Sequence, residues 1–157
     1  RWAEALENDQ LNFENTRQQD YLRNIARTGA RRPSPGESLY EMVCLPCHQP
    51  EGKGLPGVYP PLVASERLRG EPAPLIKIVL HGLTGPITVA GQNFGGPNSV
   101  PMPSLGGLSD EQIAEVLSFV RDEFGAKSGT VTPAQVKAVR AATARREGPW
   151  TAEELAR

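Results

Sequence analysis

Cys44-Leu45-Pro46-Cys47-His48 contains both cysteines of this chain of 157 residues and one of its two histidines. Two thiols three positions apart, followed directly by an imidazole, form the attachment pattern of a c-type haem. The thiols add across the two vinyl groups of the haem, and the imidazole is left facing the iron. We therefore expect one covalent haem c on Cys44 and Cys47, with His48 as the proximal iron ligand.

Three further kinds of site use a pair of cysteines and compete for this pentapeptide. A thioredoxin-like redox pair needs a preceding strand within a βαβ pattern, whereas a capped helix is predicted ahead of Cys44. A structural zinc site needs four ligands, and the rest of the chain offers only His81 and carboxylates. A plain disulfide between Cys44 and Cys47 gives His48 no role. The haem interpretation is therefore favoured, and a thiol-disulfide module stays as the weaker alternative.

The haem iron needs a sixth ligand, and the chain has two methionines. Met42 precedes the cysteines on the same predicted helix and cannot reach the opposite face of a haem. Met102 lies between Pro101 and Pro103, which restrict the backbone and lack N–H donors, as suits a loop that presents one thioether. His81 ends an apolar helical turn, where a histidine interacts favourably with the helix C-terminus. We predict His48 and Met102 as the iron ligands and a structural role for His81.

Capping signals and apolar spacing predict the helices of the central part of the chain. A capping box at Ser34 predicts the helix that carries the cysteines. A second helix is predicted over about residues 74–81, and a third follows the capping box at Ser109 and stops at Gly125. The expected inward-facing residues of the second and third helices are Ile76, Val79, Leu80, Ile113, Val116, Leu117, Val120 and Phe124. Segments 50–61 and 91–107 are rich in Gly and Pro and are predicted as loops.

The flanks continue this helical pattern. Residues 3–28 are polar with a sparse apolar set and are predicted to be helical, residues 132–146 repeat the capping pattern at Thr132, and a new capping pattern starts at Thr151 near the end of the sequence. We therefore expect three regions: an N-terminal helical extension over 1–33, a central domain over 34–125 and a C-terminal helical extension over 126–157. The predicted fold class is all-α.

Composition and charge narrow the functional class. The formal net charge is −1, with net negative charge in the central part and net positive charge in both extensions. The basic residues are scattered without interleaved aromatic residues, which argues against nucleic-acid binding. No apolar run approaches the roughly 20 residues of a membrane-spanning helix, and Arg1-Trp2 does not open a signal peptide. The N-terminal helix and the basic C-terminal tail with Arg140, Arg145 and Arg146 are expected to wrap around the domain or tether it to a partner.

The sequence from residue 34 to about 125 resembles a class I cytochrome c. The resemblance is carried by Gly36 and Tyr40 ahead of the pentapeptide, by Gly52-Lys53-Gly54, Tyr59-Pro60-Pro61-Leu62 and the Met102 loop, and by a last helix with Val116 and Phe119. It implies three to four core helices around one covalent haem. It also implies that Gly36 and Tyr40 pack across Val116 and Phe119, that the Pro60 carbonyl bonds His48, and that Tyr59, Pro60 and Leu62 belong to the haem site.

The stretch from Leu80 to Pro103 and the Leu108-Ser109-Asp110-Glu111 signal are similar to haem domains associated with bacterial quinoprotein dehydrogenases. This similarity implies one-electron transfer outside the cytoplasm, with a dehydrogenase as donor, a quinoprotein in these relatives, and an oxidase or another cytochrome as acceptor. No catalytic base or second metal is visible, so we expect an electron-transfer protein or domain and not an enzyme. If Met102 does not bind, an open iron would favour a ligand-binding sensor or a peroxide-reducing enzyme.

Overall fold

The computed structural model describes residues 16, 18–20, 22–23, 29, 31–97 and 99–156. The chain divides into two units, Arg1–Pro33 and Ser34–Arg157. The described positions 16, 18–20 and 22–23 are helical, and the rest of the helix predicted over 3–28 lies outside the described residues. The following paragraphs concern the second unit, which contains every predicted site residue.

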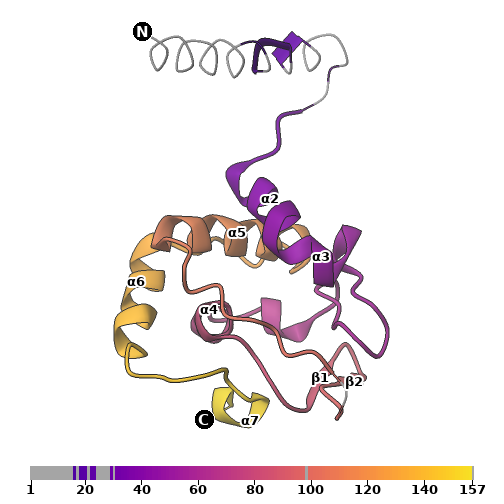
Figure 1. Cartoon of the computed structure of the whole chain (residues 1–157), viewed down its shortest axis with the longest axis vertical. Helices are drawn as coiled ribbons and strands as arrows, with labels where there is room; N and C mark the ends of the chain where they lie inside the picture. Colours follow the sequence, from indigo (N-terminus) through magenta and orange to yellow (C-terminus); the bar gives the residue numbers. More distant parts are fainter. Residues whose placement is uncertain are drawn as a thin grey trace, which may run out of the picture. The chain divides into compact units, whose positions relative to one another are not determined.

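Short helices and one small hairpin make up this unit (Figure 1). The first helical run joins α2 (Pro35–Leu39), a π-helical segment (Tyr40–Cys44) and α3 (Leu45–His48). Two 3-10 turns, Pro50–Gly52 and Glu66–Leu68, precede α4 (Ala73–His81) and the strands β1 (Ile87–Val89) and β2 (Gln92–Phe94). The last helices are α5 (Asp110–Glu123), α6 (Pro133–Ala142) and α7 (Ala152–Leu155). The fold is mostly α-helical, as predicted.

Four helices begin at a capping box that is visible in the sequence. In each, the side-chain oxygen of the N-cap residue accepts the N–H of the third helical residue, whose own side chain accepts the N–H of the N-cap residue. The pairs are Ser34 with Glu37, Ser109 with Gln112, Thr132 with Gln135, and Thr151 with Glu154. Such a cap contributes about 1 kcal/mol to helix stability. These local signals correctly predict where these four helices start. The end of α6 differs from the prediction, because the helix stops at Ala142 and not at residue 146.

The first helical run crosses α5 at close range. A Cβ on Gly36 would lie 2.3 Å from the Glu115 backbone oxygen and 2.9 Å from Phe119 Cβ, so only glycine fits at this crossing. The Tyr40 ring lies 5.6 Å from that of Phe119 and 5.3 Å from that of Phe124. The predicted approach to Phe119 is therefore present, and the closest neighbour of Gly36 is Glu115. This crossing fixes the helix that carries the cysteines on the core.

The core lies between α4 and α5, and the inward-facing residues predicted for both helices are buried except Phe124, which is half-buried at the C-cap of α5. Arg121 on α5 is also buried, at 4% exposure. Its guanidinium donates to the carbonyls of Gly70, Ser128 and Gly129. This cation therefore ties the loop before α4 and the loop after α5 to α5 itself. The sequence analysis did not single it out, because a lone arginine on a helix is usually exposed.

Residues 91–107 are not all loop, which corrects the prediction for this segment. Strands β1 and β2 form an antiparallel hairpin with Ile87 opposite Phe94. The turn residues Ala90 and Gly91 have φ angles of 48° and 73°, as a two-residue type I′ turn requires. The hairpin buries Ile87, Val89 and Phe94 in a second, smaller apolar cluster. The fold therefore includes one small sheet that the all-α prediction did not contain.

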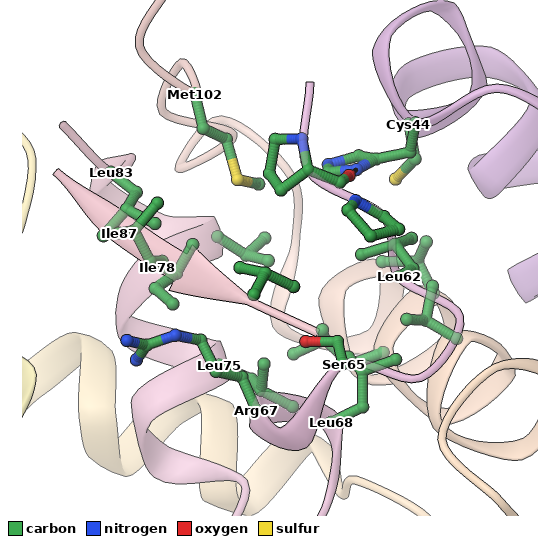
Figure 2. A pocket seen from close by; sticks show the side chains of 18 of the residues that line it. Cys44, Leu62, Ser65, Arg67, Leu68, Leu75, Ile78, Leu83, Ile87 and Met102 are labelled. Atoms are coloured by element: carbon green, nitrogen blue, oxygen red, sulfur yellow. Dashed lines mark hydrogen bonds between the residues drawn. The ribbon is translucent and has the colours of Figure 1, made fainter. Parts of the chain in front are cut away.

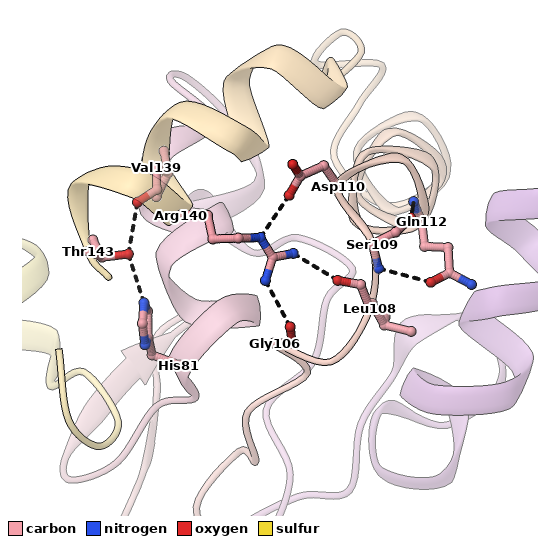
Figure 3. Close-up of polar contacts among 9 residues, drawn as sticks. All are labelled: His81, Gly106, Leu108, Ser109, Asp110, Gln112, Val139, Arg140 and Thr143. Atoms are coloured by element: carbon pink, nitrogen blue, oxygen red, sulfur yellow. Dashed lines mark hydrogen bonds and ion pairs between the residues drawn. The ribbon is translucent and has the colours of Figure 1, made fainter. Parts of the chain in front are cut away.

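The C-terminal segment belongs to the same compact unit as the central part. Helix α6 contacts both α4 and α5. Arg140 on α6 donates to Asp110 Oδ1 at 2.8 Å and to the carbonyls of Gly106 and Leu108 at 2.8 and 2.7 Å (Figure 3). Arg140 therefore binds the domain itself. This contact is compatible with the expectation that the C-terminal extension wraps around the domain. No helix among the described residues is long and apolar enough to cross a membrane.

Candidate haem site

The cysteines and His48 follow one another on the first helical run. Tyr40, buried at 4% exposure, donates its hydroxyl to the Gln49 carbonyl at 2.7 Å. Gln49 has a φ of 62° and its N–H bonds the Leu45 carbonyl at 2.8 Å, so the chain reverses directly after the histidine. Burial raises the pKa of Tyr40 to about 12, with a further contribution from Cys44. The phenol therefore stays a neutral donor that anchors the loop after His48.

His48 is oriented by a backbone carbonyl. Its Nδ1 lies 3.0 Å from the Pro60 oxygen, the contact that the family resemblance implies. The Gly54 N–H also bonds the His48 carbonyl at 2.8 Å, and a Cβ on Gly54 would lie 2.4 Å from the Tyr59 oxygen and 2.8 Å from the Pro60 oxygen. Glycine at position 54 therefore allows the two segments to approach. With Nδ1 donating to Pro60, Nε2 is the nitrogen left free to bind a metal.

Burial also sets the protonation states of the histidine and of the first thiol. It lowers the pKa of His48, an effect only partly opposed by the hydrogen bond to Pro60. A neutral imidazole is the form that ligates iron. Burial raises the pKa of the Cys44 thiol to about 11, and the neighbouring Cys47 adds to the rise. Reactive redox thiols have lowered pKa values, so Cys44 does not have the properties of a thiol-disulfide nucleophile.

An apolar cavity opens beside His48 (Figure 2). Its wall contains Cys44, His48, Pro60, Leu62 and Met102 from the predicted site, together with apolar side chains of α4, α5 and β1. In Figure 2 the sulfurs of Cys44 and Met102 both point toward the space between the two residues. An apolar space with an imidazole and a thioether on its wall suits a haem.

Met102 reaches the cavity from a segment paired with Leu83. The Met102 N–H bonds the Leu83 carbonyl at 2.9 Å, and the Leu83 N–H bonds the Met102 carbonyl at 3.1 Å. The other methionine, Met42, is 71% exposed and is absent from the cavity wall. The structure thus brings Met102 to the cavity with His48 and leaves Met42 outside.

Two residues of the predicted site lie off the cavity wall. Tyr59 accepts the Leu55 N–H at 2.9 Å through its carbonyl, and its side chain lines a separate hollow with Lys53 and Phe94. Cys47 is half-buried, one helical turn beyond Cys44. The structure therefore assembles Cys44, His48, Pro60, Leu62 and Met102 around one cavity, with Cys47 and Tyr59 beside it.

Arg67 also lines the cavity, and the sequence analysis did not single it out. It follows Glu66 in a 3-10 turn, and its Nε is buried without a hydrogen-bond partner among the described residues. A buried unpaired donor of a cation is costly, so this guanidinium suits a carboxylate that enters the cavity. Haem carries such carboxylates as its propionates. No local pattern marks Arg67, because its burial comes from contacts distant in sequence.

His81, at the end of α4, lies off the cavity wall. Its Nε2 is 2.8 Å from Thr143 Oγ1, which in turn donates to the Val139 carbonyl (Figure 3). Burial and the nearby Arg146 and Arg140 lower the pKa of His81. The neutral ring joins α4 to the end of α6 and is not part of the cavity wall. These contacts agree with the structural role that the sequence analysis assigned to His81.

Comparison with known proteins identifies the family. Residues 33–123 match the family model described as cytochrome c. The chain belongs to the cytochrome c family. Its fold is that of a class I cytochrome c, and membership implies a covalently bound haem c that transfers electrons. The cytochrome is therefore an electron-transfer component, and the comparisons do not favour the sensor, peroxide-reducing or thiol-disulfide alternatives.

Several relatives of the cytochrome are subunits of dehydrogenases. It is 34% identical over 120 residues, 74% of its length, to the alcohol dehydrogenase (quinone) cytochrome c subunit of Gluconacetobacter polyoxogenes. It is 35% identical over 130 residues, 75% of its length, to the fructose dehydrogenase cytochrome subunit of Gluconobacter japonicus. It is 38% identical over 94 residues, 57% of its length, to cytochrome c-552 of Thermus thermophilus, covering 68% of that protein. The match spans only 25% and 26% of the two dehydrogenase subunits.

Proposed function

We propose that this cytochrome binds a single haem c through Cys44 and Cys47, with His48 and Met102 as axial ligands, and passes one electron at a time. The observation that carries this proposal is the apolar cavity with the His48 imidazole and the Met102 thioether on its wall. The bound haem supplies a one-electron iron couple. The protein contributes the ligands, their orientation and the exclusion of water.

The residues around the cavity favour a high reduction potential. Pro60 fixes the orientation of the His48 ring through Nδ1. A thioether as the second axial ligand raises the potential. The apolar wall, which includes the buried Leu75, Ile78 and Val116, lowers the local dielectric constant and disfavours the more highly charged oxidised iron. Little ligand movement accompanies the electron, because both ligands stay in place.

We propose that electrons enter and leave where exposed apolar side chains surround the Met102 side of the cavity, over residues 49–59 and 94–104. Val58 and Val100 are 39% and 59% exposed. Both line a shallow hollow that shares Pro60 and Met102 with the haem cavity. A small apolar surface of this kind suits a short-lived encounter with a redox protein. By analogy with relatives that are cytochrome subunits of dehydrogenases, the donor is a dehydrogenase, and the acceptor is an oxidase or another cytochrome.

We place the cytochrome outside the bacterial cytoplasm, in the periplasm or its equivalent, because covalent haem attachment in this family takes place on the exported side. The net negative central part and the scattered basic residues fit a protein partner and no nucleic acid.

A spectroscopic redox titration of the haem-loaded protein tests the proposal. We expect one transition that follows a one-electron curve, with a low-spin spectrum in both oxidation states. The oxidised form should show the sulfur-to-iron absorption band of methionine ligation. Two separate transitions would contradict a single haem, and a high-spin spectrum would favour the sensor or peroxide-reducing alternative.

Arg67 is expected to raise the potential by placing a positive charge beside a haem propionate. Arg67→Met keeps the apolar stem and removes the cation, so the oxidised iron loses a neighbouring charge that repels it. We therefore expect the midpoint potential to fall by tens of millivolts, since one tenfold change in a one-electron equilibrium equals about 59 mV. The redox titration is run at neutral pH, where the propionate is ionised.

The exposed Arg69, two residues further along the same loop, provides the matched control. Arg69→Met removes the same charge from a position in contact with solvent, where screening weakens its effect. An equal change of potential in both variants would show that Arg67 acts only through overall charge and holds no propionate.

A further inference from the structure

The segment that carries Met102 is one edge of a three-stranded arrangement. Leu83 pairs with Met102 through two backbone hydrogen bonds, and a parallel bridge joins Leu83 to Trp150 on its other edge. The Trp150 N–H bonds the Gly82 carbonyl at 3.0 Å, and the Thr84 N–H bonds the Trp150 carbonyl at 2.8 Å. The segment from Gly82 to Thr84 is therefore held from both sides, by the predicted iron ligand and by the C-terminal segment.

The approach of these segments is close. Gly82 has a φ of 87°, and a Cβ at this position would lie 2.5 Å from the Met102 carbonyl oxygen. A shift of the Gly82 backbone toward Met102 would therefore push the Met102 backbone. Packing of this kind transmits small shifts, because protein interiors are close-packed.

The Trp150 side chain is clamped between groups of the domain. The Arg146 guanidinium lies 3.6 Å from its ring centroid and Lys77 Nζ of α4 lies 5.0 Å from it. The His81 ring meets it edge-on at 6.3 Å. Cations over an indole ring are attracted by its electrons, so three polar groups fix the ring on the end of α4. Trp150 thereby anchors the C-terminal segment beside Gly82.

The residues after Trp150 complete the anchor. Thr151 caps α7, and Glu154 accepts from Arg146 at 2.8 Å. Ala152 packs on the apolar cluster of Ile87, Val89 and Phe94, of which Ile87 and Val89 line the haem cavity. The turn of α7 therefore contacts the hairpin wall of the cavity, while Trp150 pairs with the segment that also pairs with Met102.

We propose that residues 149–155, called here the C-terminal brace, position Met102 on the haem iron. This inference rests on the proposed His48 and Met102 ligation. The brace supplies the second edge of the Gly82–Thr84 segment and thereby holds the Met102 backbone in register with Leu83. Trp150 is its positioning residue. Without the brace, the Gly82 carbonyl and the Thr84 N–H lose their partners, the paired segment gains freedom, and Met102 competes less well with external ligands.

The test measures methionine ligation in the haem-loaded protein with Trp150→Ala. We expect imidazole to displace the sixth ligand about tenfold more readily, because a weakened hydrogen bond changes an equilibrium by roughly this factor. We also expect the sulfur-to-iron band of the oxidised protein to disappear at a lower pH than in the wild type. Trp150→Phe keeps an aromatic ring beneath Arg146 and should restore most of both properties.

Arg145→Ala is the matched control, because Arg145 is exposed in the same segment, and it should leave imidazole binding unchanged. Should Trp150→Ala fail to fold, Arg146→Met removes the stacked cation and the pair with Glu154 and is expected to shift imidazole binding in the same direction. Unchanged band and imidazole affinity in a folded Trp150→Ala or Arg146→Met protein would overturn the brace and leave the proposed ligation intact. A wild-type protein without the sulfur-to-iron band would overturn the ligation and the brace together.

Discussion

Replacing both cysteines, Cys44→Ala with Cys47→Ala, is expected to abolish covalent haem attachment. Each thiol forms one thioether bond to a former vinyl group, so neither bond remains in the double variant. Acidified organic solvent should then extract the pigment completely from the variant and leave it on the wild-type chain. The protein should also be much less stable, because the apolar cavity beside His48 would no longer be filled by haem.

Glu41→Ala serves as the control for this experiment, since Glu41 is exposed on the same helical run. It should retain the pigment as the wild type does. Pigment that resists extraction from the double cysteine variant would contradict the assignment of Cys44 and Cys47 as attachment sites.

Met102→Ala is expected to lower the reduction potential and open the iron to external ligands. A thioether stabilises the reduced iron, and axial ligands set haem potentials over about 0.8 V. We therefore expect a fall on the order of 100 mV, loss of the sulfur-to-iron band and binding of added imidazole. The measurement is a redox titration combined with absorption spectra of the oxidised protein.

The other methionine provides the comparison, because Met42 is 71% exposed. Met42→Ala should keep the potential and the band of the wild type. If Met102→Ala also keeps both, the sixth ligand is another group and Met102 only lines the cavity.

Local signals explain what the sequence predicts well. Ser34, Ser109, Thr132 and Thr151 each form the capping box that their sequences indicate, because the partners lie only three residues apart. The contact between His48 and Pro60 is also as expected, although that expectation comes from the family resemblance and not from spacing.

The hairpin and the π-helical segment could not be predicted from the sequence, for physical reasons. The turn between β1 and β2 uses Ala90 at a positive φ, where Asn or Asp is the usual signal, and each strand has only three residues. The π-helical segment Tyr40–Cys44 interrupts the regular helical spacing on which a predicted apolar face depends. Both features are fixed by packing more than by local preference.

The charged residues that shape the site also cannot be recognised from the sequence. Arg67 lines the cavity, and Arg121 is buried beneath two loops. The carbonyl partner of Arg121 on Gly70 lies 51 residues away in the chain. Isolated arginines show no periodic pattern, so only the folded arrangement assigns them these positions.

The intact mass of the wild-type chain after acid unfolding tests the central claim most directly. The protein is produced in cells that attach haem to exported cytochromes, and acid removes any haem held only by axial ligands. The account predicts the mass of the polypeptide plus one haem. The mass of the bare polypeptide, or of a chain with more than one haem, would contradict it.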